Sequence, residues 1–377
     1  MKRRQLVLGA PALIGGLGWN GLAHAQGQVL TFGQSASLSG GQARYGSEVR
    51  AGIIAAFASA SKADAAKGLR YELVTLDDGG TRDRCAANVK QLIDQGVVAL
   101  VGLTSGAAAE AVLPVVHEHQ IAMLGTASGN MGIRRGEHPG VCHVRAGYDV
   151  EYQRMVQYIK DFGLRRIGYV YLQDTSKANL DAMTQALKQV GVQPAVTLPI
   201  DRNTKDLQPA AQKLLDGKLD CVLFTTNASP MLKIVEKMPA TQYSGMFFSS
   251  SFAGQDLVDG IAKLNRSVIM SLVVPRPSAL GVGVVAQCKK DLEVFGNGAK
   301  LGVTTLEGYI AGRVAVAAAR AAAAKAGGTP GRGQLRDAVT ALHTDLGGYR
   351  VAFSPDSTTG SRYVEMVIVD RYGRLVG

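Results

Sequence analysis

A chain of 377 residues, 46% of them hydrophobic, is long enough for about two domains, each with its own core. The 41 basic residues outnumber the 30 acidic ones, but they are scattered and often stand beside acids, as in Lys205-Asp206. A nucleic-acid binder would gather them on one face with aromatic residues, so we expect no nucleic-acid partner and interpret the excess as favouring solubility and anionic ligands.

The first 25 residues have the three parts of a cleavable export signal. Basic residues at 2–4 precede an apolar run at 6–22 and a small-x-small cleavage motif at 23–25. Proline and glycines interrupt the run, which favours cleavage over a permanent membrane helix. We therefore expect an exported bacterial protein that starts near Gln26, with 38 basic and 30 acidic residues. Arg3-Arg4 also fits the twin-arginine export route, and the choice between this route and the general one stays open.

Strand and helix patterns alternate from the start of the mature chain. Apolar, β-rich runs are followed by helical spacing, which predicts a parallel sheet covered on both faces. The expected order is strand 29–34, helix 49–67, strand 71–76, helix 84–95, strand 97–102, helix 107–119 and strand 121–124, then an extended segment at 141–145.

A second set of alternating elements follows. Residues 284–346 are expected to be almost all helical, and the alanine-rich part at 308–326 carries three basic residues, which favours a buried helix over a membrane span. Two alternating strands joined by a turn, a hairpin, end the chain. The remaining predictions are helices 151–163, 179–191, 206–217 and 230–238, and strands 166–172, 193–198, 220–225, 246–249, 267–274, 349–353 and 363–370.

Four cysteines lie far apart, with no CxxC and no histidine at metal spacing, so we expect no metal site. An oxidising compartment allows three full disulfide pairings among Cys85, Cys142, Cys221 and Cys288, and the sequence does not rank them. Cys221 falls inside a predicted strand and is interpreted as a small buried apolar residue.

Loops rich in Ser, Thr and Gly follow the strands of the first set. They lie at 35–41, 104–106 and 126–129. Because the carboxyl ends of parallel strands share one edge of a sheet, these loops should lie together, and hydroxyls and amides at helix starts bind carboxylates or phosphates. Each loop alone is explained by an N-cap or a tight turn. Three at one edge favour an anion pocket.

Catalytic motifs are scarce. The sequence has no GxGxxG after a strand, no phosphate loop, no HExxH and no GxSxG. Asp77-Asp78 ends a predicted strand, where a turn-capping role is favoured over an acid pair. We expect no catalytic residues, no cofactor and no enzymatic activity.

Several segments together resemble the type 1 periplasmic substrate-binding proteins, in the leucine/isoleucine/valine-binding family that serves ABC importers. The segments are Leu38-Ser39-Gly40 with Tyr45-Gly46; Asp77-Asp78 with Asn88 and Leu92-Ile93; 144–148 with Glu151; 273–277; and 306–311. The resemblance covers nearly all of the mature chain. It implies an α/β fold of two doubly wound Rossmann-like lobes, 26–146 plus 277–346 and 147–276 plus 347–377, joined by short crossover segments that act as a hinge.

The resemblance also implies the ligand contacts. By position, Tyr45, Ser105, Gly106, Ala127 and Gly129 match first-lobe contacts that hold a ligand carboxylate, with Ser39 and Ser128 beside them and Tyr148 at the first crossover. In the second lobe, Ser176 and Asn227 stand at the family's aromatic positions and Ser250 at the position of the acid that pairs with the ligand ammonium. A buried ammonium without an anion is costly. Either Asp174 or Asp256 replaces that acid, the register differs, or the ligand is a carboxylic acid without an ammonium group.

The sequence thus indicates a monomeric periplasmic receptor that captures a small carboxylate-bearing ligand, an amino acid or an organic or aromatic acid. It would deliver this ligand to the permease of an ABC importer. A ligand sensor of the same fold and an exported α/β enzyme are the alternatives. The export signal argues against a cytoplasmic sensor, and the scarcity of catalytic motifs argues against an enzyme.

Overall fold

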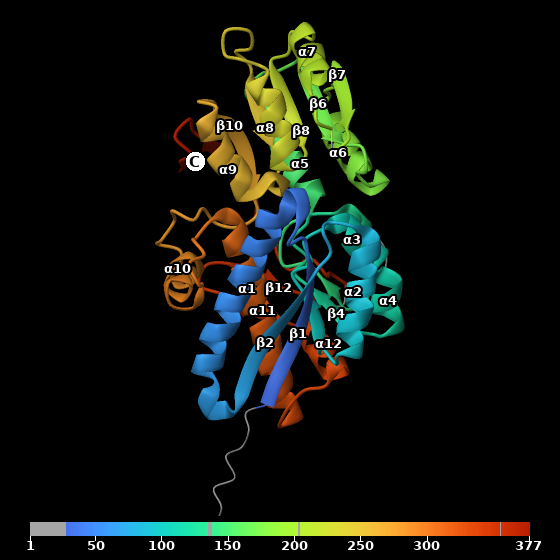
Figure 1. The fold of residues 1–377 in the computed structure, drawn as a ribbon, viewed down its shortest axis with the longest axis vertical. Coiled ribbons are helices and arrows are strands. Elements are labelled where there is room, and N and C mark those ends of the chain that lie inside the picture. The colour runs from blue at the N-terminus through green and yellow to red at the C-terminus, as the bar shows by residue number, and fades with distance from the viewer. Residues whose placement is uncertain (1–27, 135–137, 203, 355) are drawn as a thin grey trace, which may run out of the picture.

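Two largely parallel β-sheets, each covered by helices on both faces, form the two lobes of the molecule (Figure 1). The computed structural model describes residues 28–134, 138–202, 204–354 and 356–377. The predicted export signal lies outside these residues. Within the described part of the chain, no helix combines the length and the apolar character needed to cross a bilayer.

The first lobe has a five-stranded parallel sheet in the order β2-β1-β3-β4-β5. One face packs on α1, α10, α11 and α12, and the other on α2, α3 and α4. The strands are β1 (Gln28–Ala36), β2 (Leu69–Asp77), β3 (Ala99–Val101), β4 (Ala122–Leu124) and β5 (Val141–Cys142); the helices are α1 (Ala43–Ala63), α2 (Arg82–Asp94), α3 (Gly106–Ala111), α4 (Leu113–Glu118), α10 (Gly283–Phe295), α11 (Val303–Ala326) and α12 (Arg332–Thr340).

The second lobe has a seven-stranded sheet in the order β14-β13-β10-β9-β8-β6-β7, with β13 and β14 antiparallel. Helices α5 and α6 cover one face, and α7, α8 and α9 cover the other. The strands are β6 (Ile167–Leu172), β7 (Val196–Ile200), β8 (Cys221–Thr225), β9 (Met246–Ser249), β10 (Val268–Leu272), β13 (Glu365–Val369) and β14 (Leu375–Val376); the helices are α5 (Tyr148–Asp161), α6 (Lys177–Val190), α7 (Gln208–Asp216), α8 (Ala228–Glu236) and α9 (Gly254–Lys263).

The alternating order of strands and helices, the α/β class and the two-lobe architecture are confirmed, but four local predictions are wrong. Helix α9 was missed, because its two glycines lower helix propensity. The predicted helix 107–119 divides at Val112 into α3 and α4, with a proline in the first turn of α4. The helical block 284–346 ends in a strand, β11 (His343–Asp345). The predicted terminal hairpin does not form: β12 (Arg350–Ala352) pairs with β11, and β13 pairs with β10.

The hairpin prediction is wrong because alternating hydrophobicity identifies a strand but does not identify the strand with which it pairs. Tyr349, Val351 and Phe353 lie in the core of the first lobe, while β13 joins the second sheet. This packing supports a last crossover between β12 and β13, and we propose that boundary in place of residue 347.

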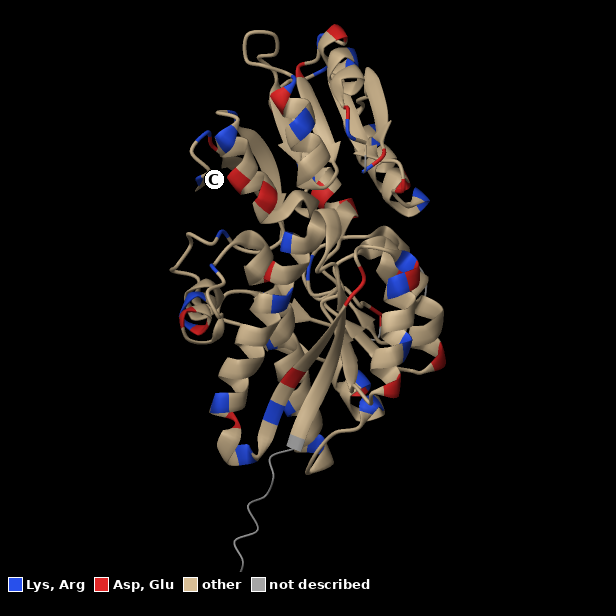
Figure 2. Cartoon of the chain, viewed as in Figure 1, with Lys and Arg blue, Asp and Glu red and all other residues tan. Residues whose placement is uncertain are grey.

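All four cysteines are buried and unpaired, so none of the three possible disulfide pairings forms in this structure. Cys221 is buried on β8, which confirms its interpretation as a core residue. Basic and acidic residues are interspersed over both lobes in the view of Figure 2, as the scattered sequence pattern indicates.

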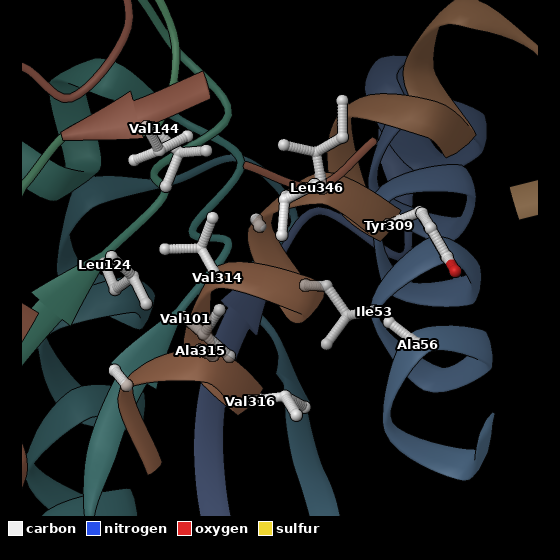
Figure 3. Packing of buried hydrophobic residues seen from close by; sticks show 14 of the residues in the cluster. Ile53, Ala56, Val101, Leu124, Val144, Tyr309, Val314, Ala315, Val316 and Leu346 are labelled. Atoms are coloured by element: carbon white, nitrogen blue, oxygen red, sulfur yellow. The ribbon is translucent and has the colours of Figure 1, made fainter. Parts of the chain in front are cut away.

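Helix α11 is buried between the first sheet and α1, and its Val314 and Ala315 lie near Val101 and Leu124 (Figure 3). Glycines let α11 approach α1 closely: a Cβ atom added to Gly308 would lie 2.1 Å from the carbonyl oxygen of Val49. The backbones therefore touch where a side chain would separate them.

Gly308→Ala should lower the free energy of unfolding by about 1–3 kcal/mol, because overpacking forces the two helices apart. Chemical denaturation measures this. Gly333→Ala is the matched control: Gly333 is helical and exposed, with nothing within 4 Å of an added Cβ. Equal stability of the two variants would contradict the close helix contact.

Candidate functional site

A cavity lies between the lobes, at the edge where the carboxyl ends of strands from both sheets meet. Ligands of open parallel sheets bind at such an edge. The first lobe contributes Gln42, Ser105, Gly106, Ala107, Ser128 and Asn130; the second contributes Tyr148, Tyr152, Leu172, Asp174, Thr175, Ser176, Asn179, Arg202, Thr225, Ser250 and Phe252.

Two serine hydroxyls of the first lobe line the cavity with a proton left to donate. Ser105 is the N-cap of α3, and its Oγ accepts a hydrogen bond from the amide of Ala108 at 3.3 Å. The Oγ of Ser128 accepts one from the amide of Asn130 at 3.2 Å. Because both oxygens act as acceptors toward the backbone, their O–H groups remain available for a ligand acceptor.

Tyr148 adds a third hydroxyl beside Ser128, with 3.5 Å between the two oxygens. Burial raises the pKa of Tyr148 to about 12, so the phenol stays protonated. One of these two hydroxyls donates to the other, and the proton of the second is then free for a ligand acceptor. The ring packs against Gly129, where an added Cβ would lie 2.5 Å from the ring, and the Gly129 carbonyl accepts the Tyr148 amide at 2.8 Å. One turn along α5, Tyr152 stacks on Tyr148 with 5.4 Å between ring centroids.

The second lobe offers polar groups and apolar surface. The Oγ of Ser250 is buried and lacks a hydrogen-bond partner among the described residues. Thr225 shares a 3.1 Å hydrogen bond with Tyr169. Leu172 and Phe252 supply apolar surface. An incoming ligand acceptor or donor would satisfy Ser250, since a hydroxyl serves as either.

The charged side chains that line the cavity, Asp174 and Arg202, pair with each other at 2.5 Å. Asp256, the other acid considered as an ammonium partner, does not line this cavity and pairs with Arg44 at 3.0 Å. Asp174 therefore lies where it could contact a ligand ammonium, but its charge is already balanced by Arg202.

The structure brings together six of the eleven predicted ligand contacts: Ser105, Gly106, Ser128, Tyr148, Ser176 and Ser250. Ser39 lies elsewhere, because its hydroxyl donates to Asp77 at 2.6 Å. Tyr45 donates to the carbonyl of Ala127 at 2.9 Å, and neither residue lines the cavity. Gly129 stands behind Tyr148, and Asn227 lines a neighbouring cavity.

Asp77 and Asp78 hold the loop that follows β1, as the turn-capping prediction expects. Asp77 accepts from the amides of Leu38 and Gly79, and Asp78 accepts from the hydroxyls of Ser35 and Ser37. The bond from Ser39 and these amides hold the pKa of Asp77 well below its usual range. Both carboxylates are therefore engaged in holding the loop.

Sequence reasoning missed Gln42, Asn130, Tyr152 and Phe252. The spacing of Tyr152, four residues after Tyr148, places both on one helix face and was a usable signal. Asn130 carried no such signal: its amide links the lobes by accepting from the Ser176 hydroxyl at 3.1 Å.

The lobes also touch beside the cavity. The amide of Met131 donates to Asn179 Oδ1 at 2.7 Å. Arg44 of α1 pairs with Asp256 and Asp259 of α9, at 3.0 Å and 2.6 Å. The lobes are therefore joined by a hydrogen bond and by ion pairs in addition to the crossover segments.

A buried ionic cluster joins the lobes at the first crossover. Arg145 donates to Glu307 of α11 at 2.9 Å, to Glu151 of α5, and to the Ser251 hydroxyl at 2.6 Å. Glu151 also accepts from the Ser271 hydroxyl at 2.7 Å. Despite burial, the two carboxylates hold the pKa of Arg145 above its usual value, while burial raises the pKa of Glu307. The arginine is therefore charged and needs both carboxylates.

Comparison with known proteins agrees with this architecture. A family model described as periplasmic binding protein matches residues 29–373. A sequence search of curated proteins finds no match. Among solved structures, a substrate-binding periplasmic protein from Ralstonia solanacearum is 26% identical, with a TM-score of 0.85 over 92% of this chain and 99% of the other.

Two more distant structures share the fold. A possible leucine/isoleucine/valine-binding protein from Rhodopirellula baltica is 24% identical, with a TM-score of 0.85 over 94% of this chain and 97% of the other. An ABC transporter solute-binding protein from R. palustris, in complex with 4-hydroxybenzoate, is 17% identical, with a TM-score of 0.75 over 90% of this chain and 92% of the other.

Arg145→Met should lower the free energy of unfolding by about 3–5 kcal/mol, because it leaves two buried carboxylates uncompensated. Chemical denaturation near neutral pH measures this. Arg350→Met is the control: Arg350 pairs with Asp345 on the surface, and its loss should leave the free energy of unfolding nearly unchanged.

Acidification provides a second readout of the cluster. Without Arg145, burial should raise the folded-state pKa of Glu307 further above the unfolded value of about 4.3, so the deficit should shrink as pH falls toward that value. A small, pH-independent deficit would contradict a buried ionic hinge.

Proposed function

The chain belongs to the periplasmic binding protein family, and from this premise we propose that it is a periplasmic receptor for a small carboxylate-bearing ligand. The ligand is captured between the lobes and delivered to the membrane permease of an ABC importer. Binding involves no chemical step, and the receptor acts as a monomer. Binding energy drives the hinge closure of the lobes.

The hydroxyls of Ser105, Ser128 and Tyr148 carry this proposal, because they line one cavity shared by both lobes. Donors held in place by their own backbone bonds stabilise an anion without a buried counter-charge. The neighbouring cation, Arg202, is already paired. Such a set of neutral donors suits a ligand carboxylate.

An acid without an ammonium group fits the rest of the cavity better than an α-amino acid does. A buried ammonium needs a free anion, and Asp174 is paired with Arg202. Tyr152, Leu172 and Phe252 offer apolar surface for an aromatic or aliphatic body. The similar protein from R. palustris holds 4-hydroxybenzoate, an acid of this class.

A thermal-shift screen of benzoate, 4-hydroxybenzoate and straight-chain acids against leucine and valine tests the proposal. At a hundred times its dissociation constant, a bound acid should stabilise the protein by about 2.7 kcal/mol. Benzamide, which keeps the shape of benzoate without its charge, is the control and should have no effect. Stabilisation by leucine or valine, but by no organic acid, would show that the ammonium does have a partner. No response to any carboxylate would overturn the proposal.

Ser105→Ala combined with Ser128→Ala should weaken binding of the best acid by at least about tenfold, since a hydrogen bond to a charged group contributes about 1.5–3 kcal/mol. Isothermal titration calorimetry measures the affinity. Because Ser105 caps α3, the unliganded variant is first checked for folding. Ser278→Ala, at an exposed serine outside the cavity, is the control. Unchanged affinity in the double variant would remove the carboxylate from this site.

A further inference from the structure

A second cavity lies between α8, α9 and the start of α1. It adjoins the cleft, because Gln42 and Phe252 line both cavities. Phe252 is only partly buried and makes an edge contact with Tyr45, with ring centroids 6.5 Å apart. Gln42 and Phe252 therefore form the partition between an inner chamber, the cleft described above, and an outer chamber, this second cavity.

One residue that lines the outer chamber, Asn227, carries a buried polar atom without a partner. Asn227 is 8% exposed, and its Oδ1 has no hydrogen-bond partner among the described residues. It stands at the N-cap position of α8, a helix of nine residues, yet its side chain makes no capping bond. A buried carbonyl oxygen without a donor is costly, so this position favours a ligand group that carries an O–H or N–H.

The remaining surroundings favour a neutral ligand end over a charged one. Leu232 and Ala253 give apolar wall beside Asn227. The acids Asp256 and Asp259, which also line the chamber, are both paired with Arg44 across the lobe boundary. Three further charged side chains, Lys233, Glu236 and Lys263, also line the chamber, but all three are exposed. An aliphatic stem ending in a hydroxyl or amide therefore matches the apolar residues and the buried acceptor of Asn227.

We propose that the outer chamber is a second part of the ligand site. It takes the far end of an elongated carboxylic acid and recognises a neutral hydrogen-bond donor there through Asn227. This inference rests on the proposed function, since the carboxylate of the same ligand lies in the inner chamber. It narrows the ligand class to acids with a terminal hydroxyl or amide, long enough to pass Phe252.

Two matched series of ligands test the inference: straight-chain acids of increasing length, and the same acids with a terminal hydroxyl. Calorimetry measures each affinity. The plain acids report on carboxylate binding, and the ratio within each matched pair reports on the outer chamber. We expect the hydroxyl to raise affinity about threefold to tenfold at the chain length that reaches Asn227, the gain of one hydrogen bond.

Variants then assign the gain to a residue. Asn227→Ala should abolish the gain in affinity from the terminal hydroxyl and leave the affinities of the plain acids unchanged. Asn227→Asp keeps an acceptor and should retain that gain. Ser105→Ala is the matched control, because it should weaken both members of each pair equally. Melting temperatures confirm that the variants fold.

The outcomes separate the two proposals. Plain acids that bind without a hydroxyl gain at any length would overturn the outer chamber and leave the proposed function standing. A gain that survives Asn227→Ala would also overturn it. If neither series binds but benzoate or 4-hydroxybenzoate does, the outer chamber fails and the proposed function stands. If no carboxylate binds at all, both proposals fail. Phe252→Ala, which removes the partition, should shift the preference toward longer acids.

Discussion

The buried charge of Arg145 is the constraint on which the arrangement of the lobes depends. A guanidinium taken out of water must be matched by carboxylates and hydrogen bonds, and here these come from three separate places in the chain. Glu307 belongs to the first lobe, and Glu151 with Ser251 belongs to the second. The crossover is therefore tied to both lobes at one point. Arg145 also lies over the ring of Tyr148, 5.8 Å from its centroid, so the hinge contacts the wall of the cleft directly.

From that hinge, the cleft follows from the topology of the sheets. Parallel strands place all of their carboxyl ends at one edge, and each lobe turns that edge toward the other. Short strands such as β3 and β4 end in loops that present Ser105 and Ser128, and Gly129 leaves room for the ring of Tyr148. Ion pairs of Arg44 with α9 then connect the lobes at a second position.

Much of this could be predicted from the sequence. Strand-helix alternation gave the two-lobe fold, and the positions of Ser105, Ser128, Ser176 and Ser250 in the cleft followed from their loops or from family resemblance. The family identification is confirmed by the match of the family model to residues 29–373. What failed depends on partners distant in the chain. The hydroxyl of Ser39 is held by Asp77, β13 pairs with β10 instead of β12, and Asn227 faces a separate cavity behind Phe252. Local pattern carries no information on such contacts.

The central claim is that neutral donors of the first lobe hold a ligand carboxylate while the second lobe closes over the ligand body. A crystal structure of the complex with the tightest-binding acid tests this most directly. The account predicts carboxylate oxygens about 2.5–3.0 Å from the hydroxyls of Ser105 and Ser128, with the body of the ligand against Tyr152 and Leu172. A ligand held by one lobe alone, or an ammonium group paired with Asp174 in place of Arg202, would contradict it.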